Sequence, residues 1–424
     1  MRIVETGERL NLRRNVESGT AEQRDAVVRI IKDVRERGDE ALLALTERFD
    51  GTSLEALPVS EAEIEAAYKH VNDDLLGALR EAAANIRDFH ERQVQQSWMT
   101  VKEDGTLLGQ KVTPLDAVGV YVPGGTASLA SSLMMGVIPA QVAGVERIVV
   151  TTPPAAEGNV APGVLVAANE IGIKEIYKVG GAQAVGALAY GTESIAPVDK
   201  IVGPGNVFVA LAKREVFGTV DIDSIAGPSE IAVLADDSAD PVYVAADLLA
   251  QAEHDVRAAA VLFTSSRKLA EAVAAEVEKQ LQDLPRRDII EQSLQDYGRI
   301  YVVRDLEEAV VAINEFAPEH LEVMVDEPMN WLGKIRHAGA IFLGPNSSEP
   351  VGDYFAGPNH VLPTSGTARF SSPLNVDDFV KKSSILSYSE EAIQANADKI
   401  AVLARQEGLE AHARAVEKRL GEDR

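Results

Sequence analysis

The first hundred residues carry apolar positions at helical spacing. One helix face is marked by Val27, Ile30, Ile31 and Val34. Thr20 and Gln23 precede this face with the spacing of a capping box, in which the two residues satisfy each other's backbone N–H groups. The pattern predicts mostly helix over residues 20–97. An Asp104-Gly105 dipeptide between two short apolar runs then predicts a hairpin.

From Leu115 onward the pattern changes to strand, turn and helix. Four β-rich runs each lead into a helical pattern, and they cover residues 117–125, 146–152, 175–181 and 200–206. Alternating units of this kind predict a doubly wound parallel sheet, whose ligands bind beyond the carboxyl ends of the strands. A further strand, a helix at 251–254 and the apolar run 258–264 indicate a second α/β unit. The fold class is therefore α/β, with helical extensions at the N- and C-termini.

We expect four parts along the chain. They are an N-terminal extension (1–24), a discontinuous α/β domain (25–114 with 237–375), a nucleotide-binding domain (115–236) and a helical tail (376–424). The tail is interrupted at Gly408 and has few large apolar residues. It cannot form a core of its own, so it must dock elsewhere.

Composition narrows the class of protein. The 424-residue chain is 46% hydrophobic and 25% charged, which suits a globular protein of two domains. No apolar run approaches the ~20 residues that span a bilayer, and the N-terminus lacks the apolar stretch of a secretory signal, so we expect a cytoplasmic protein without a membrane partner. The formal charge of −25 argues against a nucleic-acid partner, because phosphates would be repelled.

The chain has no cysteine. Disulfides, cysteine zinc sites and thiolate nucleophiles are therefore excluded. An enzyme with this sequence could not oxidise an aldehyde through a thiohemiacetal. Water would have to add to the carbonyl with the help of a general base.

A carboxylate stands beside an imidazole at Glu319-His320, directly after Pro318. Pro318 disfavours the helical conformation for Ala317 and should end the preceding helix, so the pair begins a new segment at the edge of the core. Histidine titrates near neutral pH and can act as a general base. Taken alone, the dipeptide is more commonly a surface Glu beside a capping His.

Four polar residues have the character of a metal site. Gln251 and His254 lie three apart on an expected helix and so share one face. Asp353 lies in a loop rich in glycine and proline, and His412 lies in the C-terminal tail. Two imidazoles, a carboxylate and an amide oxygen suit zinc, with room for a substrate ligand. Scattered polar residues of this kind are more often solvated or capping.

The glycine turns after three of the strands are candidates for a nucleotide site. None has the full GxGxxG pattern, and glycine by itself only permits a tight turn. Tyr121, Gln183 and Asn206 nevertheless occupy comparable positions just beyond the strand ends. A ring and two amides at these positions could contact a nucleotide, so we expect the cofactor there.

Two other classes of protein fit the same residues. A zinc hydrolase could use Glu319 to activate a metal-bound water. A non-catalytic metabolite-binding protein on an α/β scaffold would bind the same ligand without turnover.

Five segments, in this order, resemble the histidinol dehydrogenase family. They are 221–230 (DIDSIAGPSE), 250–255 (AQAEHD), 317–322 (APEHLE), 352–364 (GDYFAGPNHVLPT) and 407–412 (EGLEAH). The resemblance extends over nearly the whole chain. It implies an oxidoreductase of histidine biosynthesis that oxidises L-histidinol through L-histidinaldehyde to L-histidine in two NAD-dependent steps, with one zinc ion per subunit. It also implies two incomplete Rossmann-like domains and a homodimer with exchanged C-terminal tails.

The resemblance assigns a role to each candidate residue. Glu319 and His320 become the acid–base pair, with His320 as general base and Glu319 as the activator of water. The implied zinc ligands, which position the substrate, are Gln251, His254, Asp353 and His412. The implied substrate contacts are these four ligands with Ser229, His320, His360 and Glu407. The implied cofactor contacts are Tyr121, Gln183 and Asn206.

Overall fold

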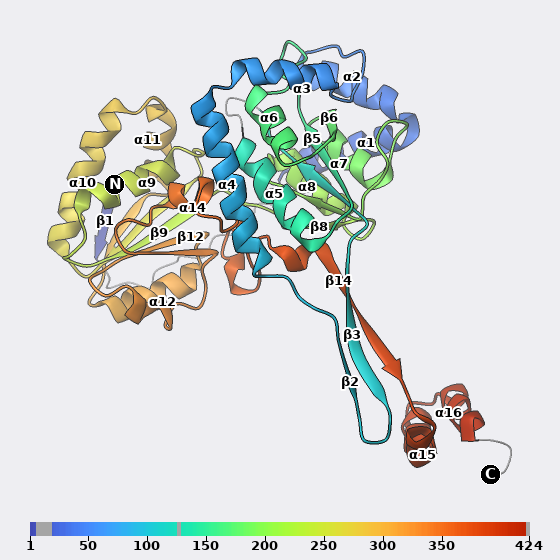
Figure 1. Cartoon of the computed structure of the whole chain (residues 1–424). Coiled ribbons are helices and arrows are strands. Elements are labelled where there is room, and N and C mark those ends of the chain that lie inside the picture. The colour runs from blue at the N-terminus through green and yellow to red at the C-terminus, as the bar shows by residue number, and fades with distance from the viewer. Residues whose placement is uncertain (6–18, 125–128, 421–424) are drawn as a thin grey trace. The chain divides into compact units, whose positions relative to one another are not determined.

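The computed structural model describes residues 1–5, 19–124 and 129–420. The chain divides into a larger unit, residues 1–93 with 116–379, and a smaller unit, residues 94–115 with 380–424. The larger unit contains two parallel sheets with helices on their faces (Figure 1). The predicted α/β fold class is therefore confirmed. Among the described residues, no helix has both the length and the apolar character needed to cross a bilayer.

The first sheet of the larger unit has five parallel strands in the order β6-β5-β4-β7-β8. Its strands are β4 (Ala117–Tyr121), β5 (Arg147–Thr152), β6 (Glu175–Lys178), β7 (Lys200–Val202) and β8 (Asp221–Ile222). Val120 of β4 lies opposite Val150 on one side and Val202 on the other. The strand order reverses between β4 and β7, so the crossovers leave in opposite directions and open a crevice at the carboxyl ends of these two strands.

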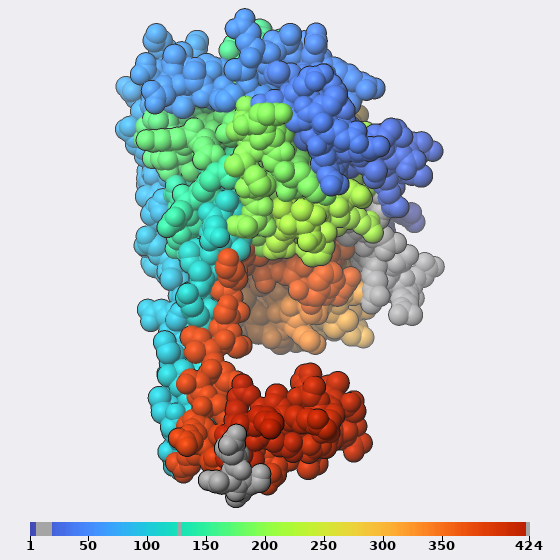
Figure 2. Space-filling view, turned by 90° about the vertical axis from the view of Figure 1, so that its right-hand side faces the viewer, coloured from blue at the N-terminus to red at the C-terminus, as the bar shows by residue number. Residues whose placement is uncertain are grey.

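Eight helices of the described chain accompany this sheet. The crossover helices are α5 (Ala130–Ala143), α6 (Pro162–Glu170), α7 (Gly181–Tyr190) and α8 (Val207–Val216). The N-terminal helices are α1 (Ala21–Arg37), α2 (Asp39–Asp50), α3 (Glu61–Ala67) and α4 (Asp73–Glu91). Figure 2 shows these N-terminal helices, in blue, lying over the green crossover segments. The capping box predicted at Thr20 and Gln23 begins α1, so the helical prediction for this region is confirmed.

The N-terminal helices belong with the five-stranded sheet, which corrects the expected division. Val27, Ile31 and Val34 of α1 are buried in one core with Leu188 of α7. The sequence pattern had led us to expect residues 25–114 in one α/β domain with residues 237–375. An amphipathic face shows that a helix is buried, but it does not identify the sheet against which the helix packs.

The second sheet has six parallel strands in the order β1-β11-β10-β9-β12-β13. Its strands are β1 (Arg2–Glu5), β9 (Glu230–Ala235), β10 (Ala259–Thr264), β11 (Arg299–Val302), β12 (His320–Met324) and β13 (Ala340–Leu343). Its helices are α9 (Pro241–Ala252), α10 (Arg267–Gln280), α11 (Arg287–Asp296), α12 (Leu306–Phe316), α13 (Met329–Leu332) and α14 (Glu349–Tyr354). Short 3-10 helices among the described residues are Tyr68–His70, Leu281–Asp283, Thr367–Arg369, Val376–Phe379 and Lys418–Leu420.

Two of the expected domain boundaries disagree with the strand pairing of this sheet. β9 pairs with β10 and β12, so the boundary between the two α/β parts lies between β8 and β9 and not at residue 236. β1 forms the edge strand beside β11, although the N-terminus was expected to be a separate extension. Both differences arise because strand pairing joins residues far apart in sequence, which a local pattern does not specify.

The smaller unit is an antiparallel sheet in the order β14-β3-β2 followed by two helices. β2 (Trp98–Val101) and β3 (Leu107–Pro114) form the predicted hairpin, with Gly105 at a φ of 79°. β14 (Val380–Ser387) pairs with β3 along its whole length, so this part of the expected helical tail is a strand. The helices are α15 (Glu390–Gln406) and α16 (Glu410–Glu417), and Gly408 separates them as predicted.

Candidate active site

A cavity of about 970 Å³ lies in the larger unit, between the carboxyl end of the five-stranded sheet and the amino end of the six-stranded sheet. Residues 203–207 and 223–229 form one part of its wall. Candidate residues from the other sheet line it as well: His254, Glu319, His320, Asp353 and His360. The cavity therefore lies at the carboxyl ends of the strands, where ligands were expected, for the five-stranded sheet only. α9 runs back from the carboxyl to the amino end of the other sheet, so the residues at its C-terminus reach the amino end.

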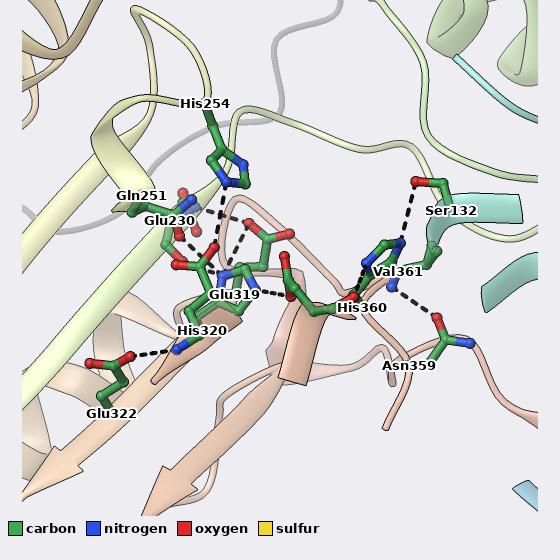
Figure 3. A network of polar contacts seen from close by, with 12 residues as sticks. Ser132, Glu230, Gln251, His254, Glu319, His320, Glu322, Asn359, His360 and Val361 are labelled. Carbon is green, nitrogen blue, oxygen red and sulfur yellow. Dashed lines mark hydrogen bonds and ion pairs between the residues drawn. The ribbon is translucent and has the colours of Figure 1, made fainter. Parts of the chain in front are cut away.

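Glu319 and His320 are held by one backbone unit of β9. α12 ends at Phe316, Ala317 turns the chain with a φ of 51°, and His320 begins β12. The N–H of Glu230 donates to Glu319 Oε2 at 2.9 Å. The carbonyl of Glu230 lies 3.2 Å from His320 Nδ1, and Gln251 Oε1 lies 3.1 Å from the same nitrogen (Figure 3). With two oxygens facing Nδ1, the proton belongs there, and Nε2 is the atom left for chemistry.

Burial and neighbouring carboxylates set the charge of this pair. Glu319 and His320 are 7% and 2% exposed. Burial raises the pKa of Glu319 to about 8. Burial acts to lower the pKa of His320, but the carboxylates of Glu319, Glu349 and Asp353 outweigh it and raise that pKa to about 10. Glu319 can therefore exchange a proton near neutral pH, whereas His320 can act as a base there only when a cation offsets the charge of the neighbouring carboxylates.

The metal candidates of the larger unit converge beside His320. Gln251 lies in the last turn of α9, which ends at Ala252. His254 lies two residues beyond that end and not on the helix as expected, and Asp353 lies on α14. Asp353 Oδ1 is 3.6 Å from His320 Nε2, and His254 Nε2 is 3.7 Å from Glu349 Oε1. His320, Glu349 and Asp353 have donor atoms within 4.8 Å of one another. This cluster has the carboxylate and imidazole donors that a divalent cation needs.

Several polar atoms of this cluster are buried without a hydrogen-bond partner among the described residues. They are Gln251 Nε2, His320 Nε2 and Glu349 Oε2. Buried polar atoms are rarely left unsatisfied, so their convergence indicates a site built to receive a ligand. The oxygen of Gln251 faces His320 in this structure. If Gln251 bound a metal ion through this oxygen, the oxygen would have to contact both the ion and His320, or give up its contact with His320.

Glu349 was missed by the sequence-based analysis. It is 2% exposed, and burial raises its pKa to about 7. Its spacing from Asp353 was a usable signal, because residues four apart on a helix share one face. The proline-rich context instead led us to expect a loop, whereas Pro350 occupies the first turn of α14, where proline is tolerated.

The remaining substrate candidates of the larger unit also reach the cavity. Ser229 lies in its wall just before β9. His360 Nδ1 is 3.0 Å from the carbonyl of Asp353, and its Nε2 is 3.3 Å from Ser132 Oγ (Figure 3). Ser132 belongs to α5, so this contact links the helices of one sheet to the loops of the other. No local pattern distinguished Ser132 from other helical serines.

The cofactor candidates gather at the carboxyl end of the five-stranded sheet. Asn206 lines the cavity and caps α8, accepting from the N–H groups of Phe208 and Val209 at 3.0 and 3.2 Å. Its oxygen is thus occupied, which leaves the amide nitrogen to donate to a ligand. Tyr121 is buried at the end of β4, where its hydroxyl accepts from the N–H of Gly181 at 3.1 Å, and Gln183 is buried in α7.

Glu407 and His412 belong to the smaller unit. Glu407 is the C-cap of α15, and His412 lies in α16. Both side chains are exposed on that unit.

Comparison with known proteins gives consistent matches over the whole chain. The model of the histidinol dehydrogenase family matches residues 13–420. The chain is 65% identical over 424 residues to the histidinol dehydrogenase of Halalkalibacterium halodurans, covering 100% of both chains. It is 66% identical over 411 residues to that of Geobacillus kaustophilus, covering 97% of each. The crystal structure of histidinol dehydrogenase from Elizabethkingia anophelis matches with a TM-score of 0.95 and 39% identity, over 99% of this chain and 98% of that one.

Proposed function

The chain belongs to the histidinol dehydrogenase family, and we propose that it oxidises L-histidinol through L-histidinaldehyde to L-histidine with two molecules of NAD. The zinc hydrolase that the residues alone left open is not supported, because the family is one of oxidoreductases. One observation carries the proposal: the Glu319-His320 pair lies in the wall of a cavity whose other side holds Asn206. Acid–base groups and a nucleotide-binding loop facing one space suit hydride transfer.

His320 is the general base of both oxidations. Its Nδ1 faces the carbonyl of Glu230 and the amide oxygen of Gln251, so the ring is fixed and Nε2 faces the reacting atoms. In the first oxidation, the hydroxyl proton of histidinol passes to Nε2 while the carbinol carbon gives its hydride to NAD. A well-placed base of this kind contributes on the order of 10²–10⁴ in rate.

Glu319 acts between the two oxidations. The aldehyde carbonyl has to take up water, because the chain has no cysteine with which to form a thiohemiacetal. A carboxylate with a raised pKa is a stronger base than an ordinary surface glutamate, and Glu319 takes the proton of the attacking water. The proton that His320 took in the first oxidation passes to the carbonyl oxygen, and the resulting hydrate can then give a proton to His320 and its hydride to a second NAD. Loss of two hydrides and uptake of one water thus convert the alcohol to the carboxylate.

Zinc would be held by Gln251, His254 and Asp353 of one chain with His412. The carboxylate and imidazole donors beside His320, and the unpaired buried atoms around them, support a divalent cation there. When bound, zinc would hold the imidazole and amine of histidinol and offset part of the carboxylate charge that raises the pKa of His320. NAD would contact Asn206, Tyr121 and Gln183 at the carboxyl ends of β7, β4 and β6.

We propose a homodimer in which Glu407 and His412 reach the partner's cavity. Both residues are exposed on the smaller unit, and this unit also exposes apolar residues that a partner could cover. These residues, each more than half exposed, are Trp98, Met99, Val101, Leu386, Val402 and Leu403. Exposed apolar surface of this extent is typical of a protein interface.

The stoichiometry of the reaction tests the proposed function. We expect two NADH for each histidinol consumed, with little free aldehyde, measured by absorbance of the reduced nicotinamide together with quantification of histidine. One NADH per substrate with accumulating aldehyde would overturn the four-electron reaction. Binding of histidinol without any NADH would instead favour a metabolite-binding protein.

A further inference from the structure

Gly203, which follows β7, has no room for a side chain. Its φ is 116°, and an added Cβ would lie 2.1 Å from the carbonyl oxygen of Tyr121 on the neighbouring strand. The loop from Gly203 to Asn206 therefore begins in close backbone contact with β4, where a residue other than glycine would clash. This loop is the part of the five-stranded sheet that lines the cavity.

A buried ion pair holds both backbone polar groups of Gly203. Lys213 of α8 and Asp223, which follows β8, form a salt bridge, and each side chain is only 4% exposed. The ammonium group of Lys213 donates to the carbonyl of Gly203 at 3.0 Å. The carboxylate of Asp223 accepts from the N–H of Gly203 at 2.8 Å. Three segments, namely the loop, α8 and the start of the 223–229 segment, are thus joined at one residue.

Core packing alone does not account for this pair. Removing two charges from water is costly, and apolar side chains of similar size often stabilise a core as well as a buried ion pair does. The pair instead fixes the loop backbone at one place on the cavity wall, through its hydrogen bonds to the N–H and the carbonyl of Gly203. Both side chains also line that cavity. Asn206 lies three residues beyond the fixed glycine, at the other end of the same loop.

We propose that Lys213 and Asp223 are positioning residues for the cofactor, which hold the Gly203–Asn206 loop so that Asn206 can present its amide nitrogen to NAD. This inference rests on the proposed function, because it takes the carboxyl end of the five-stranded sheet as the NAD site. The pair acts through the loop. It should therefore affect NAD affinity much more than histidinol affinity.

The main test compares two buried lysines of the same sheet. Lys213→Met removes the anchor. Lys200→Met is the matched control, because Lys200 is also buried and pairs with an aspartate, Asp221, at 3.0 Å, but lies at the amino end of β7. Dissociation constants for NAD are measured by fluorescence titration of the full chain, and KM for NAD, KM for histidinol and kcat by steady-state kinetics. Thermal melting shows which variants are folded.

We expect Lys213→Met to raise the Kd and KM for NAD by about tenfold or more, because Asp223 is left buried without its counter-charge and the carbonyl of Gly203 loses its donor. Lys200→Met should leave both within about twofold of wild type, even where it lowers the melting temperature similarly. Asp223→Asn keeps an acceptor for the Gly203 N–H and should give a smaller rise. It replaces Lys213→Met as the decisive variant if the latter does not fold.

Two results would overturn the inference. One is unchanged NAD affinity in folded Lys213→Met, or in Asp223→Asn if Lys213→Met does not fold. The other is an equal loss of affinity in Lys200→Met, which would show a general effect of stability. Asn206→Ala separates this inference from the proposed site: if it binds NAD normally, the NAD site itself is wrong. If Asn206→Ala weakens NAD binding and the Lys213 and Asp223 variants do not, only the anchoring role fails.

Discussion

Glu319→Gln separates the two oxidations in a way that follows from the geometry. Glu319 Oε2 accepts from the N–H of Glu230 at 2.9 Å, and the amide oxygen of glutamine can accept the same bond. The side chain should stay in place and lose only its capacity to take a proton. We therefore expect hydration of the aldehyde to fail while the alcohol oxidation, for which His320 is the base, continues.

The expected magnitude comes from the role of a general base. Loss of a well-placed base costs on the order of 10²–10⁴ in rate, or roughly 2.7 to 5.4 kcal/mol of barrier at about 1.36 kcal/mol per tenfold. Oxidation of histidinal by Glu319→Gln should fall by about this factor. Oxidation of histidinol to the aldehyde should change by less than about tenfold, because Glu319 influences it only through the pKa of His320.

Single-turnover kinetics measure the two steps separately. The variant is mixed with NAD and either histidinol or histidinal, and the appearance of NADH is followed by stopped-flow absorbance. His320→Asn is the comparison variant, because loss of the common base should slow both steps. If Glu319→Gln slowed both steps equally, Glu319 would only position His320, and its assignment as the activator of water would be wrong.

Three further predictions concern the metal, the dimer and a buried histidine. A chelator should abolish turnover but leave NAD binding largely intact; full activity in protein shown by elemental analysis to be metal-free would contradict this. A purified heterodimer of His412→Asn and His254→Asn chains should recover up to about half of wild-type activity, because C2 symmetry leaves one complete site, and no recovery would argue for a site built from a single chain. His90 of α4 is fully buried, and burial lowers its pKa below 6.5. The unfolded chain therefore takes up the proton first, and stability should fall as pH drops below 6.5. Melting temperatures should show a shallower fall in His90→Gln, and an unchanged slope would exclude His90 as the cause.

The sequence by itself determined the elements and much of the chemistry. The capping box at Thr20, the glycine turn at Gly105 and the break at Gly408 are local features whose effect depends on neighbouring residues only, and each was found where predicted. The end of α12 before Pro318 has the same local cause. Gln251 and His254 were expected on one helix, but α9 ends at Ala252, so His254 lies just beyond the helix and reaches the cavity from the segment that follows it.

Only the tertiary structure decided which elements meet. β14 was expected to be helical, yet it forms a strand because β3 offers it eight successive partners. Glu349 joins the cluster at His320 because β13 lies beside β12, and Lys213 meets Asp223 at Gly203 because α8 crosses from β7 to the neighbouring strand β8. Helix caps and glycine turns act within a few residues, and the sequence shows them directly. Strand order and the burial of charged groups depend on contacts between distant segments, whose free energy is set by the whole packed fold.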